Sequence, residues 1–290
     1  MALDSAELER TRHDGGAFRV TPGSRLRLSG ADAFRYLNGQ ITRDLKRLVD
    51  HEALSACILT PKGKLCALLL IHREGSDLIV ESDVEVGEAL RERLERYLVA
   101  DDVVITEEFW PERIHLFGDA LEQAKKSSVG ISLSRLAVPG CDLPPESLDS
   151  TVELLDPSLV EILRIERGIP AWGREIGPET LPPEAGLDRT AIDYDRGCYP
   201  GQEVISRLKS IGRVNRLLHG FRGDELRPGM KILSAEGSEL GKLTSVASLL
   251  KTTGCVALGY LPRGTGAPLF ASDPLTGEGT PLSITATFGT

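Results

Sequence analysis

Residues 196–203 read Arg-Gly-Cys-Tyr-Pro-Gly-Gln-Glu, and this octet predicts a tight turn beside a cysteine. Proline is second and glycine third in Tyr199-Pro200-Gly201-Gln202, the order that suits a type II turn. The next residues, 204–208, fit either a short helix or a strand. If they are helical, Cys198 lies just ahead of a helix N-terminus with Arg196 and Arg207 nearby, surroundings that favour thiolate chemistry. The alternative is a buried, unreactive cysteine beside the turn.

The octet resembles the lysine-Gly-Cys-Tyr-any-Gly-Gln-Glu signature of the YgfZ family of folate-binding proteins. Members of that family are relatives of the glycine-cleavage T-protein and take part in iron–sulfur cluster maturation. Arg196 replaces the usual lysine and keeps its charge, and Pro200 occupies the variable position. Further stretches are similar to other blocks of the family, so that the resemblance runs from about residue 24 to 218: residues 28–45, 60–64, 164–170, 183–188 and 211–216.

The resemblance implies an α+β fold in which two interleaved α+β domains and a small C-terminal β-barrel surround a central folate channel. It implies a discontinuous folate-binding domain from residues 1–50 with 137–212. Residues 51–136 would form a second α+β domain, and residues 213–290 the barrel. The interleaving comes from the resemblance and not from the periodicity of the sequence.

Composition places the chain among soluble globular proteins and excludes several classes. Of its 290 residues, 41% are hydrophobic and 27% charged, and no run of 18 apolar residues is present. The first 12 residues lack the apolar segment of a secretory signal. A net charge of −9 argues against general nucleic-acid binding. The five cysteines are scattered without a Cys-x-x-Cys pair, so we expect a reducing cytoplasm, no disulfide framework and no permanently bound metal.

Hydrophobic periodicity predicts the main elements. Alternation predicts a strand at residues 24–29, and residues 54–59 and 65–71 fit two further strands joined by the turn at 60–64. Short glycine-punctuated strands after residue 211 indicate a small β-barrel. Helices are predicted from Asp32, across 86–98, and from Pro157 to Arg167, where Asp156 serves as N-cap and Pro157 as the first helical residue. The proline-rich, acidic stretch 138–151 predicts a linker or an exposed loop.

The predicted helix 157–167 carries a carboxylate, Glu166, on its apolar face. A buried carboxylate must be paired, hydrogen-bonded or protonated. One interpretation is a structural ion pair with Arg164, Arg189 or Arg207, and the other is contact with a ligand. In the related T-proteins this block borders the folate pocket, which makes Arg164 and Glu166 candidates. The other candidates for tetrahydrofolate binding belong to the signature and to the residues directly after it: Tyr199, Gln202, Glu203 and Arg207. Cys198 is the candidate reactive thiol.

One feature of the T-proteins is missing from the sequence. They resemble one another around a Gly-Gly-x-x-Asp-Asp segment, in which an aspartate faces the folate nitrogen that accepts the carbon unit. Aligning residues 62–67 with that segment puts Cys66 and Ala67 in place of the aspartates. Because an alanine cannot exchange a proton, we expect the usual aminomethyl transfer to be disabled, with a loss of about 10²–10⁴-fold in rate.

Three functions follow as hypotheses. The first is a cytoplasmic, tetrahydrofolate-binding accessory protein that meets iron–sulfur assembly factors or client proteins transiently. The second is an aminomethyltransferase-like one-carbon enzyme, for which Asp44 is the nearby acid. The third is an interaction scaffold with a vestigial folate pocket.

Overall fold

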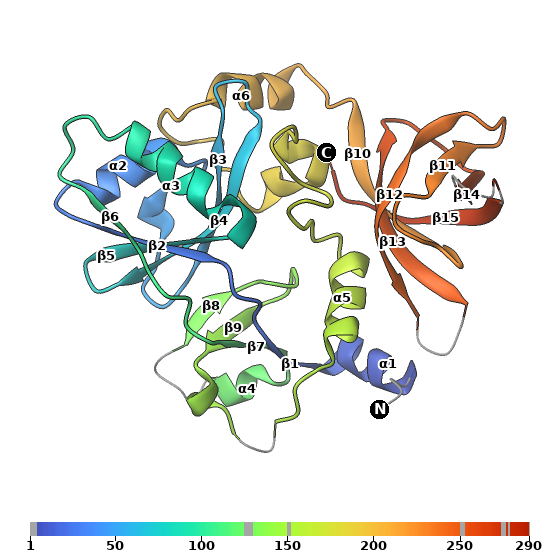
Figure 1. The fold of residues 1–290 in the computed structure, drawn as a ribbon, viewed down its shortest axis with the longest axis horizontal. Helices are drawn as coiled ribbons and strands as arrows, with labels where there is room; N and C mark the ends of the chain where they lie inside the picture. The colour runs from blue at the N-terminus through green and yellow to red at the C-terminus, as the bar shows by residue number, and fades with distance from the viewer. Residues whose placement is uncertain are drawn as a thin grey trace.

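A computed structural model describes residues 5–124, 130–149, 152–249, 253–273, 277 and 279–289. The chain is α+β and contains three β-structures: a five-stranded sheet, a four-stranded sheet and a closed barrel (Figure 1). No helix among these residues is both long enough and apolar enough to cross a membrane.

The five-stranded sheet has the order β3-β4-β5-β2-β6 and is antiparallel throughout. Alternate residues of β3 and β4 pack beneath helices α2 and α3, as Ala56 and Leu69 do beside Leu37 and Leu90. The opposite face is turned toward the centre of the molecule (Figure 1). The elements are β2 Ser24–Ser29, α2 Ala33–Gln40, β3 Leu54–Leu59, β4 Leu65–Glu74, β5 Asp77–Ser82, α3 Gly87–Arg96 and β6 Val104–Glu107.

The four-stranded sheet corrects one prediction. Its order is β1-β7-β9-β8, and the buried strand β9 lies inside residues 138–151, which the sequence predicts as a linker. The strand is not evident in the sequence because it contains a charged residue, Asp142. That residue is buried in the structure and is stabilised there by ion pairs that form only on folding. Residues 150 and 151 lie outside the described residues. The elements are α1 Ser5–Asp14, β1 Gly15–Arg19, β7 Ile114–Gly118, α4 Leu121–Ala124, β8 Ile131–Leu133 and β9 Gly140–Leu143.

The predicted C-terminal barrel is confirmed. Six strands close in the order β10-β13-β12-β11-β14-β15 around a core that includes Phe221, Ile232 and Leu261. Its strands are β10 Arg216–Asp224, β11 Lys231–Ser234, β12 Glu239–Ser248, β13 Gly254–Pro262, β14 Leu269–Ser272 and β15 Gly279–Thr287.

Helices α5 (Pro157–Glu166) and α6 (Gln202–Ser210) connect these parts. Asp156 caps α5 as predicted, accepting a hydrogen bond from the Ser158 amide at 2.8 Å. Helix α5 packs against β12 and β13 of the barrel. Five 3₁₀ turns complete the described elements: η1 Leu45–Arg47, η2 Val84–Val86, η3 Pro145–Ser147, η4 Pro182–Ala185 and η5 Leu187–Arg189.

The sheets cross the domain boundaries that the resemblance implies. Strand β2, from residues 1–50, pairs with β5, from residues 51–136. Strand β1 likewise pairs with β7. The division into domains stays a prediction.

Candidate functional site

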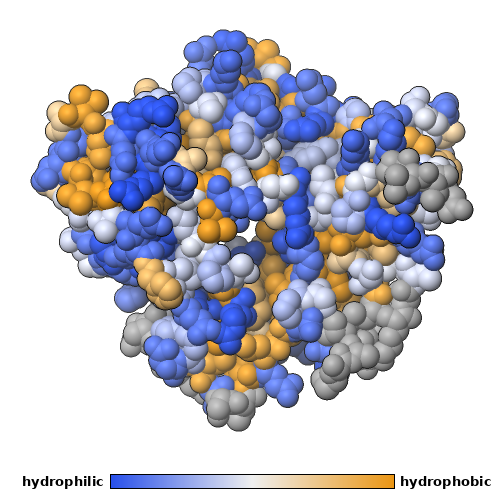
Figure 2. All heavy atoms as spheres, viewed as in Figure 1, coloured by the Kyte–Doolittle hydropathy of each residue, from blue (hydrophilic) through white to orange (hydrophobic). Residues whose placement is uncertain are grey.

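A cavity of about 1450 Å³ lies where the two sheets and the C-terminal part of the chain meet. Figure 2 shows the hollow at the centre of the molecule, bordered by apolar surface. The five-stranded sheet supplies one wall, the β8–β9 hairpin another, and residues 167–170 and 185–190 a third. Phe288, which follows the last barrel strand, also lines the cavity.

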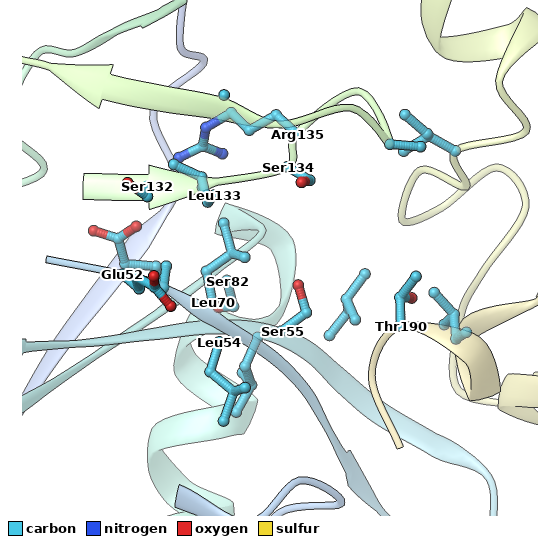
Figure 3. A pocket seen from close by; sticks show the side chains of 18 of the residues that line it. Glu52, Leu54, Ser55, Leu70, Ser82, Ser132, Leu133, Ser134, Arg135 and Thr190 are labelled. Carbon is cyan, nitrogen blue, oxygen red and sulfur yellow. The ribbon is translucent and has the colours of Figure 1, made fainter. Parts of the chain in front are cut away.

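The sheet wall is apolar at its centre and polar along its edges. Leu70 lies between Ser55 on β3 and Glu81 on β5, to which it is paired in register, so these three residues share the cavity face. Leu68 lies two residues away on the same face. Across the cavity stand Ser132, Ser134 and Arg135 (Figure 3). The arrangement suits a flat apolar ring with hydrogen-bonding groups on its rim.

A buried ionic network joins the two sheets at the edge of this wall. Glu81 accepts a hydrogen bond from Arg25 at 2.9 Å and a second from Arg113. Arg113 also lies 3.5 Å from Asp142 of the other sheet. Burial by itself would raise the pKa of Glu81, but the hydrogen bonds from His72 and Arg113 outweigh it and lower that pKa to about 2.

Asp142 orients Arg135, a guanidinium that lines the cavity. Both Asp142 oxygens receive hydrogen bonds from it, Nε to Oδ1 at 3.0 Å and Nη2 to Oδ2 at 2.6 Å. His115 lies 2.8 Å from Asp142 Oδ1 through Nδ1. Against the opposing effect of burial, these contacts lower the pKa of Asp142 to about 2. Neither Asp142 nor Arg135 stands out in the sequence, since their ion pairs form only across folded strands.

One end of the cavity is basic. Arg43, Arg47 and Arg189 all line it, and we call this group the cationic mouth. Arg43 and Arg47 share one carboxylate oxygen, Oδ1 of Asp193, each at 3.1 Å. Arg189 is exposed and makes no ion pair with any residue that the structure describes.

The signature loop lies against the 60–64 turn, at the start of α6. The type II turn is confirmed: Gly201 has φ of 86°, and the Gln202 amide donates to the Tyr199 carbonyl at 3.2 Å. The residues after it are helical, which resolves the alternative left open by the sequence. Arg196 fastens the loop to the end of α2 by donating to the carbonyls of Asn38 (2.5 Å), Ile41 (2.9 Å) and Arg43.

The predicted signature residues lie together, although none of them lines the cavity. Cys198 is exposed, whereas Tyr199 is buried in a core shared with Ala185 and Leu187 of the cavity wall. Gln202 donates to the Arg196 carbonyl at 3.3 Å. Two of the candidates pair with each other on the exposed face of α6, where the Glu203 carboxylate accepts from Arg207 at 2.8 Å.

The two candidates on α5 face the barrel. Arg164 is surrounded by acceptors, among them Glu161 (2.8 Å) and the Ile169 carbonyl (2.6 Å). Glu166 forms ion pairs, but not with the predicted arginines. Its partners are Arg12, at 2.9 Å, and Arg222, at 3.1 Å, because α1 and the barrel pack over this face. The assignment of Arg164 and Glu166 to a ligand stays a prediction.

The strand that would carry the T-protein aspartates presents no carboxylate to the cavity within its described length. Ala67 packs beneath the helices, and Cys66 packs against the same core. Burial raises the pKa of the Cys66 thiol. The Asp44 carboxylate accepts a hydrogen bond from the Lys46 amide at 3.0 Å and so caps η1. Among the residues described, no three His, Cys, Asp or Glu side chains form a group that could hold a metal.

Comparison with known proteins supports the fold and leaves the family open. The chain is similar to the glycine cleavage system aminomethyltransferase T of Bartonella henselae, whose crystal structure aligns with a TM-score of 0.78, 19% identity and coverage of 97% of this chain and 88% of that one. The architecture is therefore that of aminomethyltransferase T. An uncharacterized protein of Haemophilus influenzae is 28% identical over 240 residues, which are 77% of this chain and 81% of that protein. No protein-family model matches the chain.

Proposed function

We propose that the protein is a cytoplasmic, tetrahydrofolate-binding accessory protein of the YgfZ type that serves iron–sulfur cluster assembly or repair. The observation that carries the proposal is the cavity of about 1450 Å³ at the centre of an aminomethyltransferase-like fold. The iron–sulfur role is proposed because the signature octet, residues 196–203, resembles that of YgfZ proteins.

The lining of the cavity fits a reduced pterin. Leu68 and Leu70 offer an apolar surface to the ring, and the ring edge needs paired donors and acceptors. Arg135 supplies donors from a guanidinium that Asp142 holds in place. Ser55, Ser132 and Ser134 supply hydroxyl groups that both donate and accept.

The same face argues against one-carbon transfer by the usual route. Leu68 and Leu70 occupy the β4 positions that face the cavity, so this strand offers no group that could exchange a proton with a folate nitrogen. Glu81 lines the cavity too, but its carboxylate is engaged by Arg25 and Arg113. With β4 lacking such a group, an aminomethyltransferase is the weaker candidate, and it would have to use Asp83, a cavity-lining carboxylate whose pKa burial raises.

Cys198 is proposed as the thiol that meets iron–sulfur assembly factors or client proteins. It is exposed on a loop that Arg196 fastens, so a partner can reach it. Tyr199, the next residue, packs in one core with Leu187 and Ala185 of the cavity wall. This shared core provides a physical connection between the ligand and the loop.

Calorimetric titration with tetrahydrofolate tests the proposal. The wild-type chain should show saturable binding. Leu70→Trp fills the cavity face and should weaken binding at least about tenfold, since the ring loses its place. Val99→Trp adds the same side chain at a position that is 91% exposed and should bind as the wild type does. Thermal melting of each variant reports folding, and a wild-type chain that takes up no ligand at millimolar concentration overturns the proposal.

A further inference from the structure

The surface around Cys198 is basic, in contrast to the chain as a whole. Three segments meet there: 41–47, 60–64 and 193–216. Together they hold ten basic and four acidic side chains, whereas the net charge of the chain is −9. Charge concentrated in this way raises the rate at which a protein meets a partner of the opposite charge. We call the surface of these three segments the basic docking surface.

Specific contacts hold the three segments together. Arg196, in the signature loop, donates to the carbonyls of Ile41, at 2.9 Å, and of Arg43. Gly201 lies against the 60–64 turn, where an added Cβ would meet a backbone oxygen at 2.5 Å. Because the surface is already fixed in the free protein, it loses little entropy when a partner docks.

Several cations of this surface lack a carboxylate partner. Lys62 and Arg213 are exposed and form no ion pair with any residue that the structure describes. Lys209 lies over the ring of Tyr194, with Nζ 3.6 Å from the ring centroid. This contact brings the end of α6 against the segment that leads into the signature loop, so the positive charge of α6 lies on the same side of the protein as Cys198.

An apolar side chain projects from the same end of α6. Ile211 directly follows the helix and is 88% exposed. The amides of Ile211 and Gly212 both donate to the Arg207 carbonyl, at 3.0 and 2.8 Å, which fixes the backbone at this point. An apolar contact bordered by charged groups is typical of protein–protein interfaces.

The occupant that fits this surface best is an acidic protein. Single-stranded nucleic acids stack their bases on exposed aromatic rings, but Tyr199 is buried and the Tyr194 ring is covered by Lys209. A phosphate backbone would also meet two exposed carboxylates, those of Asp195 and Glu203. A protein can place basic groups against these two and carboxylates against the more numerous cations.

We propose that the basic docking surface binds an acidic face of a partner protein and brings that partner to Cys198. The inference rests on the proposed function and names the kind of surface by which an iron–sulfur assembly factor or client is recognised. Exposed ion pairs contribute modestly and are screened by salt, so the docking is transient. Its main effect is on the rate at which the partner meets the thiol.

The experiment compares the rates at which the full chain reacts with two activated peptides that differ only in charge. Each peptide carries one cysteine in a disulfide with an aromatic thiol, and one peptide has glutamates where the other has glutamines. The Cys198 thiolate displaces the aromatic thiol and forms a disulfide with the peptide, and absorbance reports the released thiol. The acidic peptide should react about tenfold faster at low salt, and high salt should bring the ratio toward one.

Lys209→Gln/Arg213→Gln should lower this ratio about threefold, since it removes two cations that no carboxylate neutralises. The matched control is Arg10→Gln/Arg96→Gln. These two arginines, on α1 and α3, are exposed and form no ion pair with the described residues. The control should keep the wild-type ratio, which separates a local effect from one of net charge. Cys198→Ala should lose the reaction with both peptides.

Equal rates of the wild type with the two peptides, or the same ratio in Lys209→Gln/Arg213→Gln and its control, overturn the inference. Micromolar binding of a 20-nucleotide single-stranded RNA that the same variant abolishes would assign the surface to a nucleic acid instead. Tetrahydrofolate binding should not change in this variant, because both residues lie outside the cavity lining. A wild-type chain that binds no tetrahydrofolate overturns the proposed function itself, whatever the peptides show.

Discussion

A Cβ on Gly201 would lie 2.5 Å from the carbonyl oxygen of Thr60. The signature loop and the 60–64 turn therefore fit together only with glycine at position 201. Gly63, on the other side of the contact, lies against Val204, where an added Cβ would come within 2.9 Å of Cγ1. Two motifs that are far apart in sequence thus form one interlocked unit at the turn that joins β3 and β4.

Gly201→Ala should destabilise the protein. The residue has φ of 86°, a left-handed conformation that costs an L-residue about 1–2 kcal/mol, and the clash with Thr60 adds to that cost. We expect a melting temperature several degrees below that of the wild type. Gly197→Ala is the matched control, because an added Cβ there meets no atom within 4 Å, and it should change stability by less than about 0.5 kcal/mol. Equal melting of the two variants would show that the contact is unimportant.

Asp142→Asn should break the ionic network between the sheets. It removes the charge that balances Arg135, and it leaves the buried Arg113 with Glu81 as its acidic partner. The expected loss is about 3–5 kcal/mol in the free energy of unfolding, measured by urea denaturation. Glu88→Gln on the exposed face of α3 should alter it by less than about 0.5 kcal/mol. If Asp142→Asn had the same free energy of unfolding as the wild type, the network would not stabilise the fold.

Stability should fall in acid because of Glu81 and Asp142. Both have a folded-state pKa lowered to about 2, from ordinary values of 4.5 and 3.8. Between the folded and unfolded pKa values, the unfolded chain binds more protons than the folded one. The two carboxylates therefore stabilise the fold fully above about pH 4.5, and this stabilisation is lost as the pH falls toward 2. For the wild type, the free energy of unfolding measured across this range should fall steeply as the pH falls. Asp142→Asn should show a shallower slope, and an unchanged slope would contradict the assignment.

Cys198 should be the fast-reacting thiol of the folded protein. It is exposed, whereas burial raises the pKa of Cys57 to about 12 and that of Cys141 to about 11. Titration with a disulfide reagent should lose its fast phase in Cys198→Ala and keep it in Cys57→Ala. The first variant should melt like the wild type yet fail to complement a cluster-maturation defect. Full complementation by it would leave the thiol without the proposed role.

Local elements were predictable because local chemistry decides them. Asp156 and Pro157 begin α5 as their residue types require, and the strands predicted at residues 24–29 and 54–59 have the bounds of β2 and β3. Strand β9 was missed since its buried Asp142 is explained only by His115 and Arg135, which come from other parts of the folded sheet.

The site was less predictable than the fold. Arg43, Arg135 and Arg189 look ordinary in sequence, and only the folded chain brings them to one cavity. Glu166 illustrates the same limit: its place on the apolar face of α5 called for a partner, yet Arg12 is 154 residues away. Chemistry that depends on such distant pairs cannot be derived from spacing along the chain.

A crystal structure of the protein soaked with tetrahydrofolate tests the central claim most directly. The account predicts a pterin ring against Leu68 and Leu70, with its edge toward Arg135. Density for the ligand beside Cys198 on the surface of α6, with the cavity holding only solvent, would contradict it.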